Sequence, residues 1–233
     1  MNGPLATAIL LAGGSSTRMQ GQIADKILEP ISGKPAILHC MEAFHATNAI
    51  HTFVIVHRDA TQRCAIEELL PLSNVSIRWA LGGTERKDSV WAGLQATSEE
   101  TEIALIHDCA RPCVTPQAIR ESIDQARKTG AACLAHPVAN TIKLKNGNAL
   151  ETLDRSKLWA TETPQTFRYP LIRDAYQQII ANGQPITDDL SAIESQDIPI
   201  IFIDNGQPNP KLTTPHDLAY AEMILTQTKN GPA

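Results

Sequence analysis

Near the N-terminus the sequence reads Ala8-Ile9-Leu10-Leu11-Ala12-Gly13-Gly14-Ser15-Ser16-Thr17-Arg18-Met19, and this stretch decides the fold class. Its first five residues form a short apolar run of the kind found in buried strands. Two glycines, three hydroxyl side chains and an arginine follow at once, which predicts a tight turn from the strand into a polar loop.

The loop has the composition of a phosphate-binding site. Gly13 and Gly14 lack a Cβ, so their backbone N–H groups can approach a phosphate closely. Arg18 adds a planar cation suited to phosphate oxygens. The loop matches neither Gly-x-x-x-x-Gly-Lys-Ser/Thr nor Gly-x-Gly-x-x-Gly. Taken alone, it leaves a turn without any ligand as the alternative.

Short apolar runs alternate with helical patterns along the rest of the chain. Predicted strands cover residues 8–12, 52–57, 75–80, 103–107, 131–136 and 199–203. Predicted helices cover residues 34–47, 60–70, 84–97, 116–129, 170–182, 188–194 and 215–226. This alternation predicts an α/β fold with a Rossmann-like, mostly parallel sheet and helices on both faces. No repeat or linker interrupts the pattern, so residues 1–233 are expected to form a single domain.

One stretch breaks the alternation. Residues 141–145 and 149–153 alternate in polarity around Asn146-Gly147-Asn148, which predicts a β-hairpin. An apolar hairpin that projects from the body needs a covering surface, and a second copy of the chain can supply it. We therefore predict a homodimer through an arm at about residues 139–158, with an arm folded on its own domain as the alternative.

The composition argues against several classes of protein. The net charge of −5 gives no basic surface for nucleic acid. The longest apolar runs are too short to cross a bilayer, and the N-terminus shows no signal-peptide pattern, so no membrane partner and a cytoplasmic location are expected. The five cysteines include no Cys-x-x-Cys pair, which predicts reduced, mostly buried thiols.

A second polar block, His107-Asp108-Cys109-Ala110-Arg111-Pro112, follows the predicted strand at residues 103–107. Ligands of open α/β sheets gather at the carboxyl ends of strands. The carboxylate of Asp108 is a hard oxygen ligand that suits Mg²⁺, and Arg111 could bind an anionic second substrate. The alternative is an Asp–Arg ion pair at the edge of the sheet.

A third block, Gly82-Gly83-Thr84-Glu85-Arg86-Lys87-Asp88-Ser89, leads into a predicted helix. Amides and hydroxyls at a helix start suit the edge of a base or a ribose. A capped helix start without a ligand, with Thr84 as the cap, uses the same residues.

Further blocks follow in order: Asp154-Arg155-x-x-Leu158-Trp159, Thr163-Pro164-Gln165-x-Phe167, Thr187-Asp188 and Lys211-Leu212-Thr213. Together with the three blocks above, they make the chain resemble the 2-C-methyl-D-erythritol 4-phosphate cytidylyltransferases of the non-mevalonate isoprenoid pathway. The resemblance extends from Ala8 to about Leu225, which is nearly the full length.

The resemblance implies a nucleotidyltransferase domain whose partners are CTP and a polyol phosphate. In such an enzyme the phosphate of methylerythritol phosphate attacks the α-phosphorus of CTP in line, and pyrophosphate leaves. Transfer of this kind depends on positioning and charge neutralisation rather than on a protein nucleophile. The resemblance further implies Mg²⁺, or another divalent cation, as the cofactor and a homodimer through the arm.

The resemblance also assigns roles to residues. The implied catalytic cations are Arg18, Lys26, Arg155 and Lys211. The implied CTP-binding residues are Ala12, Gly13, Gly14, Ser16, Gly83, Thr84, Ser89, Asp108 and Ala110, with Asp108 also the metal ligand. The implied residues for the polyol phosphate are Arg111, Thr141, Arg155, Thr163, Thr187 and Lys211.

The chain departs from the usual family pattern in three places. Ser16 stands where glycine is usual, Asp25 where proline precedes the catalytic lysine, and Thr84 where aspartate is common. The interval from Arg18 to Lys26 is also one residue longer than in many members.

Three rival functions are also compatible with these residues. Ribitol-5-phosphate cytidylyltransferase has the same fold and chemistry, although the block that begins at Asp154 favours methylerythritol phosphate. A non-catalytic nucleotide-binding homologue is the second. An NAD-binding domain is the third, but it predicts an acidic residue at the end of the second strand, where His57 and Arg58 stand.

Overall fold

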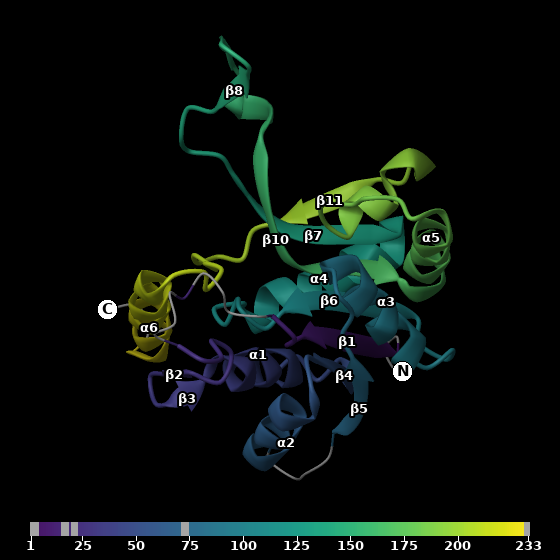
Figure 1. Cartoon of the computed structure of the whole chain (residues 1–233), viewed down its shortest axis with the longest axis vertical. Coiled ribbons are helices and arrows are strands. Elements are labelled where there is room, and N and C mark those ends of the chain that lie inside the picture. The colour runs from purple at the N-terminus through teal and green to yellow at the C-terminus, as the bar shows by residue number, and fades with distance from the viewer. Residues whose placement is uncertain (1–4, 15–18, 20–22, 71–74, 231–233) are drawn as a thin grey trace.

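The computed structural model of the protein describes residues 5–14, 19, 23–70 and 75–230. Within them one large sheet has the spatial order β11-β7-β10-β6-β1-β4-β5 (Figure 1). Its strands are β1 (Ala6–Leu11), β4 (Ile50–His57), β5 (Ser76–Leu81), β6 (Ile103–Asp108), β7 (Ala131–Pro137), β10 (Trp159–Arg168) and β11 (Ile200–Ile203). Strand β10 is antiparallel to β6 and β7, and the other neighbours are parallel. The predicted mostly parallel α/β sheet is confirmed.

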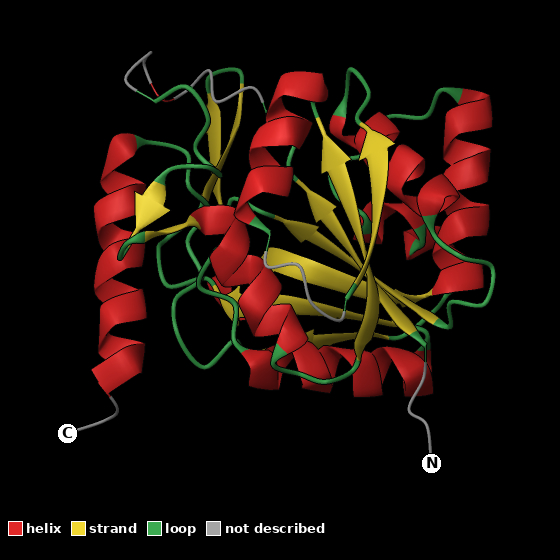
Figure 2. Ribbon diagram, turned by 90° about the horizontal axis from the view of Figure 1, so that it is seen from below, coloured by secondary structure: helices red, strands yellow, loops and turns green. Residues whose placement is uncertain are grey.

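Helices cover both faces of this sheet (Figure 2). Helices α1 (Ala36–His45), α2 (Ala60–Leu69) and α4 (Pro116–Thr129) share one hydrophobic core, whereas α3 (Arg86–Ala96) and α5 (Tyr169–Asn182) share another. In β1, Ala8 and Leu10 belong to the first core and Ile9 to the second, because successive side chains of a strand point to opposite faces. A strand buried on both faces reads as an unbroken apolar run, which is why β1 was predictable.

The sequence did not predict β10. Its segment contains Pro164, which cannot donate to a strand ladder, and several polar residues. The register between β10 and β7 shifts between Thr161 and Gln165, which accommodates the proline. The buried Thr166 hydroxyl donates to Ser122 Oγ at 2.9 Å. The polar side chains of β10 can be buried because they have hydrogen-bond partners. This strand, whose sequence resembles a loop, therefore lies beside the centre of the sheet.

The predicted helix at residues 188–194 is wrong. The structure has two short 3₁₀ turns there, Leu190–Ala192 and Glu194–Gln196. The N–H groups of Asp189 and Leu190 donate to Gln165 Oε1 at 2.9 and 3.0 Å. These bonds attach the start of the segment to β10. The two turns do not join into one helix, because Ile193 between them has a φ of −118° and a ψ of −2°.

The predicted hairpin is present as β8 (Lys143–Asn146) and β9 (Ala149–Thr152), and Figure 1 shows it projecting from the body. Asn146 pairs with Ala149, so Gly147 begins the turn and its φ of 60° suits a glycine. Every residue of both strands is exposed. We call residues 139–158 the arm.

The remaining elements, β2 (Pro30–Ile31), β3 (Lys34–Pro35) and α6 (Pro215–Asn230), lie together at one side of the molecule (Figure 1). The short strands β2 and β3 pair with each other, and α6 joins a third hydrophobic cluster with Ile31 and Leu212. The cysteines are free, and all but Cys64 are buried, so the prediction of mostly buried thiols is confirmed. Among the residues that the structure describes, no helix is both long and apolar enough to cross a membrane.

Candidate active site

A pocket of about 340 Å³ opens at the carboxyl ends of β1 and β6. Leu11 at the end of β1 pairs with Asp108 at the end of β6, so the chain beyond each strand enters the same cavity. This is where ligands of open α/β sheets bind. The lining includes many residues singled out in the sequence: Ala12, Gly13, Gly14, Lys26, Gly83, Thr84, Ser89, Asp108, Ala110 and Lys211.

Gly13 and Gly14 lie beside Arg58 and Lys26. A Cβ on Gly13 would lie 3.4 Å from Arg58 N, and one on Gly14 would lie 3.9 Å from Lys26 Cε. Ala12 N donates to Val56 O at 2.9 Å, which continues the pairing of β1 with β4 into the loop. Two residues of the predicted site, Ser16 and Arg18, lie outside the described residues.

Asp108 is the acidic centre of the pocket. Its Oδ2 accepts a hydrogen bond from Lys211 Nζ at 2.5 Å, and its Oδ1 lies 3.4 Å from Arg86 Nη2. Burial by itself would raise the pKa of Asp108, but the positive charges of Arg86 and Lys211 outweigh it and hold that pKa well below its usual range. The carboxylate is therefore ionised at neutral pH and holds two cations at the pocket wall.

Arg86 lines the pocket, although no role was predicted for it from the sequence. Its two terminal nitrogens donate to both oxygens of Asp189 at 2.8 Å, a bidentate pair. Asp189 is fully buried and also accepts from the Tyr176 hydroxyl at 2.5 Å. Burial alone would lower the pKa of Arg86, but Asp189 raises it. Arg86 stands in one polar block of the sequence, but Asp189 lies 103 positions further on, directly after the block Thr187-Asp188, and sequence alone cannot show that the two meet.

The start of α3 forms the opposite wall. Glu85, not Thr84, is the N-cap, and it forms a capping box with Asp88. Gly83 N donates to Ser89 Oγ at 3.1 Å, and a Cβ on Gly83 would lie only 2.3 Å from Asp88 Cβ. Only glycine fits there, so the Gly83 backbone is left facing the pocket beside Thr84.

Asp108 is positioned from behind by a chain of hydrogen bonds. Asp108 N donates to Thr163 Oγ1 at 3.1 Å, and Thr163 Oγ1 lies 3.1 Å from His107 Nδ1. His107 Nε2 lies 3.2 Å from Arg111 O. One assignment of hydrogens satisfies all three contacts. Neutral His107 donates a hydrogen bond from Nε2–H to Arg111 O, and its Nδ1 accepts a hydrogen bond from the Thr163 hydroxyl. Burial agrees, since it lowers the pKa of His107 to about 4.

A family model described as 2-C-methyl-D-erythritol 4-phosphate cytidylyltransferase matches residues 6–227, which includes every described residue of this pocket. The chain belongs to this family. The family's enzyme from Shouchella clausii is 37% identical over 226 residues, covering 96% of this chain and 97% of the relative. The one from Geobacillus kaustophilus is 41% identical over 221 residues, covering 94% and 96%.

Solved structures agree on the fold. The crystal structure of 4-diphosphocytidyl-2C-methyl-D-erythritol synthase from Anaerococcus prevotii has a TM-score of 0.84 at 24% identity, covering 96% of this chain and 99% of that one. The 2-C-methyl-D-erythritol 4-phosphate cytidylyltransferase of Francisella tularensis has a TM-score of 0.77 at 25% identity, covering 94% and 99%. The resemblance inferred from the sequence is confirmed, and the chain is a cytidylyltransferase, a nucleotidyltransferase enzyme.

In this cytidylyltransferase, several residues predicted to meet the polyol phosphate do not line the pocket. Thr141 and Arg155 lie on the arm, where Arg155 Nη1 donates to Ala139 O at 2.7 Å. Thr187 Oγ1 lies 3.0 Å from Ser191 Oγ. Arg111 Nη1 donates to Asn209 O at 2.8 Å and lines a second cavity.

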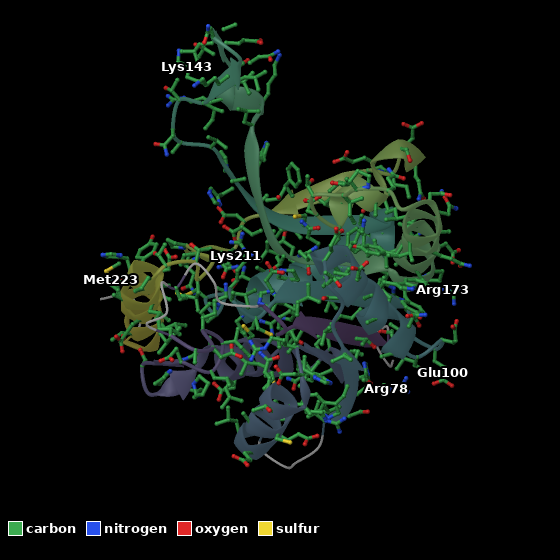
Figure 3. All side chains as sticks on the ribbon, in the orientation of Figure 1. Arg78, Glu100, Lys143, Arg173, Lys211 and Met223 are labelled. Atoms are coloured by element: carbon green, nitrogen blue, oxygen red, sulfur yellow. The ribbon has the colours of Figure 1, made fainter. Side chains whose placement is uncertain are left out.

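Thr163 is likewise buried behind the pocket, with its hydroxyl engaged as described above. Figure 3 labels Lys143 on the arm and Lys211 in the body, and the two are well separated. Within one chain, the pocket and the arm therefore form two separate groups of predicted site residues.

Proposed function

We propose that this cytidylyltransferase acts by direct in-line attack, as a single nucleotidyltransferase domain. An oxygen of the phosphate of 2-C-methyl-D-erythritol 4-phosphate forms a bond to the α-phosphorus of CTP while the bond to pyrophosphate breaks. The products are 4-diphosphocytidyl-2-C-methyl-D-erythritol and pyrophosphate. The observation that carries the proposal is a single pocket that unites the glycine loop, two lysines and an ionised aspartate.

The nucleotide takes the described pocket in this proposal. Its triphosphate lies along Gly13 and Gly14, whose backbone can approach phosphate oxygens. Lys26 and Lys211 line the same cavity and offset the charge of the triphosphate and of the attacking phosphate. Arg18 is proposed to act with them.

The opposite wall holds the nucleoside. The backbone of Gly83 and the hydroxyls of Thr84 and Ser89 offer hydrogen bonds to cytosine, and Ala110 and Asp108 lie toward the ribose. The capped start of α3 fixes this wall before the nucleotide arrives, because Gly83 N, Ser89 and Glu85 bond to one another.

We also propose Mg²⁺, or another divalent cation, as the cofactor, held by Asp108. In the described part of the chain, no cluster of three or more His, Cys, Asp or Glu side chains could hold a metal alone. One carboxylate that shares the ion with substrate phosphates suits Mg²⁺, and Asp108 is ionised and lines the pocket. The ion supplies further charge neutralisation for the triphosphate.

The acceptor end of the site is proposed to need a second copy of the chain. The strand residues of the arm are all exposed, including Leu144 at 51% and Leu150 at 67%. A two-stranded hairpin has little stability by itself, so a covering surface is expected. In a homodimer, Thr141 and Arg155 of one copy serve the pocket of the other. Arg111, Thr163 and Thr187 remain predicted contacts of the polyol phosphate, and the cytoplasm remains the predicted location.

Pyrophosphate release tests the proposed reaction. The protein is incubated with Mg²⁺, CTP and either methylerythritol phosphate or ribitol 5-phosphate. We expect turnover with methylerythritol phosphate and little with UTP in place of CTP. Turnover with ribitol 5-phosphate alone would assign the rival acceptor. Tight binding of CTP without pyrophosphate release from either acceptor would leave a non-catalytic nucleotide-binding protein.

A further inference from the structure

A buried carboxylate, Asp25, lies behind the pocket and has no part in the reaction proposed above. Its exposed fraction is 8%, and it directly precedes Lys26. Its Oδ2 accepts from Gln62 Nε2 at 2.6 Å and lies 3.3 Å from Arg58 Nη1. Its Oδ1 accepts from Ile27 N at 3.3 Å. Burying a charge without partners is costly, so this set of donors explains how the carboxylate is tolerated.

The same two donors also hold the glycine loop. Gln62 Nε2 donates to Ala12 O at 3.0 Å, and Arg58 Nη1 donates to Gly14 O at 3.4 Å. Each donor is an NH₂ group with two hydrogens, so each can serve Asp25 and one loop carbonyl together. Arg58, after the end of β4, and Gln62, in the first turn of α2, thereby join Gly14 and Ala12 to the segment that carries Lys26.

Gln62 is held firmly in this bridging position. It is 2% exposed, its Oε1 accepts from Arg58 N at 2.7 Å, and its own N–H donates to Asp59 Oδ1 at 2.8 Å. The Arg58 N–H can bond only to the amide oxygen, so the amide NH₂ must face Ala12 O and Asp25. In this fixed orientation, the amide NH₂ of Gln62 donates to the Asp25 carboxylate.

Lys26 extends to the other side of the same segment. Its Nζ donates to Leu212 O at 2.8 Å, beside Lys211, and its Cε lies close to Gly14. Fixing the backbone at Asp25 therefore fixes the point from which Lys26 reaches into the pocket. A displacement of about 1 Å at such a group is enough to lower a rate on the order of 100-fold.

We propose that Asp25 is a positioning residue for the nucleotide pocket. Through Gln62 and Arg58, its carboxylate holds the Lys26 segment against the glycine loop, so that the triphosphate site is formed before the nucleotide binds. The proposal rests on the proposed function, in which this pocket takes CTP.

The sign of a mutational effect separates positioning from simple electrostatics. Asp25 is an anion near a site for an anionic nucleotide, so charge repulsion alone says that its removal tightens CTP binding. Positioning requires the opposite. In Asp25→Asn, the new amide NH₂ faces the Gln62 and Arg58 donors if its oxygen bonds to Ile27 N, and it faces Ile27 N if it turns the other way. Either orientation loses part of the bridge.

The experiment measures CTP dissociation constants by calorimetry, with KM for CTP and for methylerythritol phosphate from pyrophosphate release. We expect Asp25→Asn to raise the Kd and KM for CTP about tenfold while KM for the acceptor stays unchanged. The matched control is Glu67→Gln. Glu67 is an exposed carboxylate of α2 that pairs with Arg63 at 2.9 Å. Because this surface pair lies outside the bridge, the CTP Kd of the control should stay within about twofold of wild type.

Each outcome decides the proposal. Unchanged or tighter CTP binding by folded Asp25→Asn would overturn it, as would an equal loss in both variants or an equal rise in acceptor KM. If Asp25→Asn fails to fold, Arg58→Met replaces it. The Arg58 side chain is 37% exposed, and it joins the Asp25 carboxylate to the carbonyl of Gly14. That variant should weaken CTP binding about threefold, and no change would overturn the proposal. If the wild-type protein does not bind CTP, the proposed function itself is contradicted, and the role of Asp25, which rests on it, is contradicted as well.

Discussion

The pocket and the arm differ in how their residues are held. Asp108 in the pocket wall and Asp189 behind Arg86 are both buried, and each is bonded to at least two other side chains. On the arm, every residue of β8 and β9 is exposed, and the Arg155 side chain donates to the backbone of Ala139 on the same arm. The pocket is therefore organised by its own chain, whereas the arm has no core of its own and its role depends on what covers it.

Removal of one pocket cation gives the largest expected effect. Lys211→Met leaves Asp108 with Arg86 alone and removes a charge beside the proposed phosphates. We expect kcat/KM to fall by roughly 10²–10³-fold with the fold intact. Steady-state pyrophosphate release and circular dichroism check this. Lys128→Met, at the exposed end of α4, is the control and should retain wild-type activity.

The buried His107 makes the body, and not the arm, sensitive to acid. Burial lowers its pKa from 6.5 to about 4, so between these values the unfolded chain binds more protons than the folded one. The free energy of unfolding should therefore decrease as pH falls from about 6.5 to about 4, by on the order of 3 kcal/mol. Urea unfolding at several pH values measures this.

Two variants separate the His107 effect from general acid sensitivity. His107→Gln should flatten the pH dependence in this window. His51→Gln, at an exposed position of β4, should keep the wild-type slope. An equal slope in all three proteins would show that His107 is not the cause.

Two glycines compare packing in the body with packing on the arm. A Cβ on Gly93 of α3 would lie 2.5 Å from Ile9 Cγ2, so Gly93→Ala should lower the free energy of unfolding by about 2 kcal/mol. Gly147 has open space around it and a φ of 60°, so Gly147→Ala should cost under about 1 kcal/mol, confined to the turn. Equal losses in urea unfolding would contradict the contrast between the two regions.

A charge in place of an exposed leucine of the arm tests its covering surface. Leu150→Asp should raise the dissociation constant of the homodimer about tenfold or more, because a carboxylate would enter an apolar contact. Analytical ultracentrifugation measures the change. Glu151→Gln changes a polar residue of the same strand without bringing a new charge into the contact, and should leave the dimer intact. A wild-type monomer at every concentration would refute the homodimer.

The sequence predicted what depends on local pattern. The apolar run that became β1 and the Asn-Gly turn of the hairpin each carry their signal within a few residues. Strand β10 was not predicted, because Pro164 and its polar neighbours resemble a loop. Hydrogen-bond partners from elsewhere in the fold, such as Ser122, allow these residues to form a buried strand. The same holds for residues 188–194, whose conformation depends on Gln165.

The site was predictable to the extent that its residues follow strands. The loop after β1 and the block at Asp108 meet because neighbouring parallel strands end at the same edge. Arg86 with Asp189, and Asp25 with Gln62, are pairs distant in sequence that only the fold brings together. The arm is a third case, since Arg155 lies away from the pocket of its own chain and its proposed role needs a second chain.

A subunit-mixing experiment tests the central claim, that each pocket is completed by the arm of the other copy. Lys211→Met disables the pocket, and Arg155→Ala disables the arm, so each homodimer should be nearly inactive. In a mixed dimer, the intact pocket of the Arg155→Ala chain meets the intact arm of the Lys211→Met chain. After equimolar subunit exchange, half of the dimers are mixed and each has one intact site, so activity should recover to roughly a quarter of wild type. Exchange confirmed by mass spectrometry without any recovery would contradict the claim, because it would place Arg155 and the pocket in the same chain.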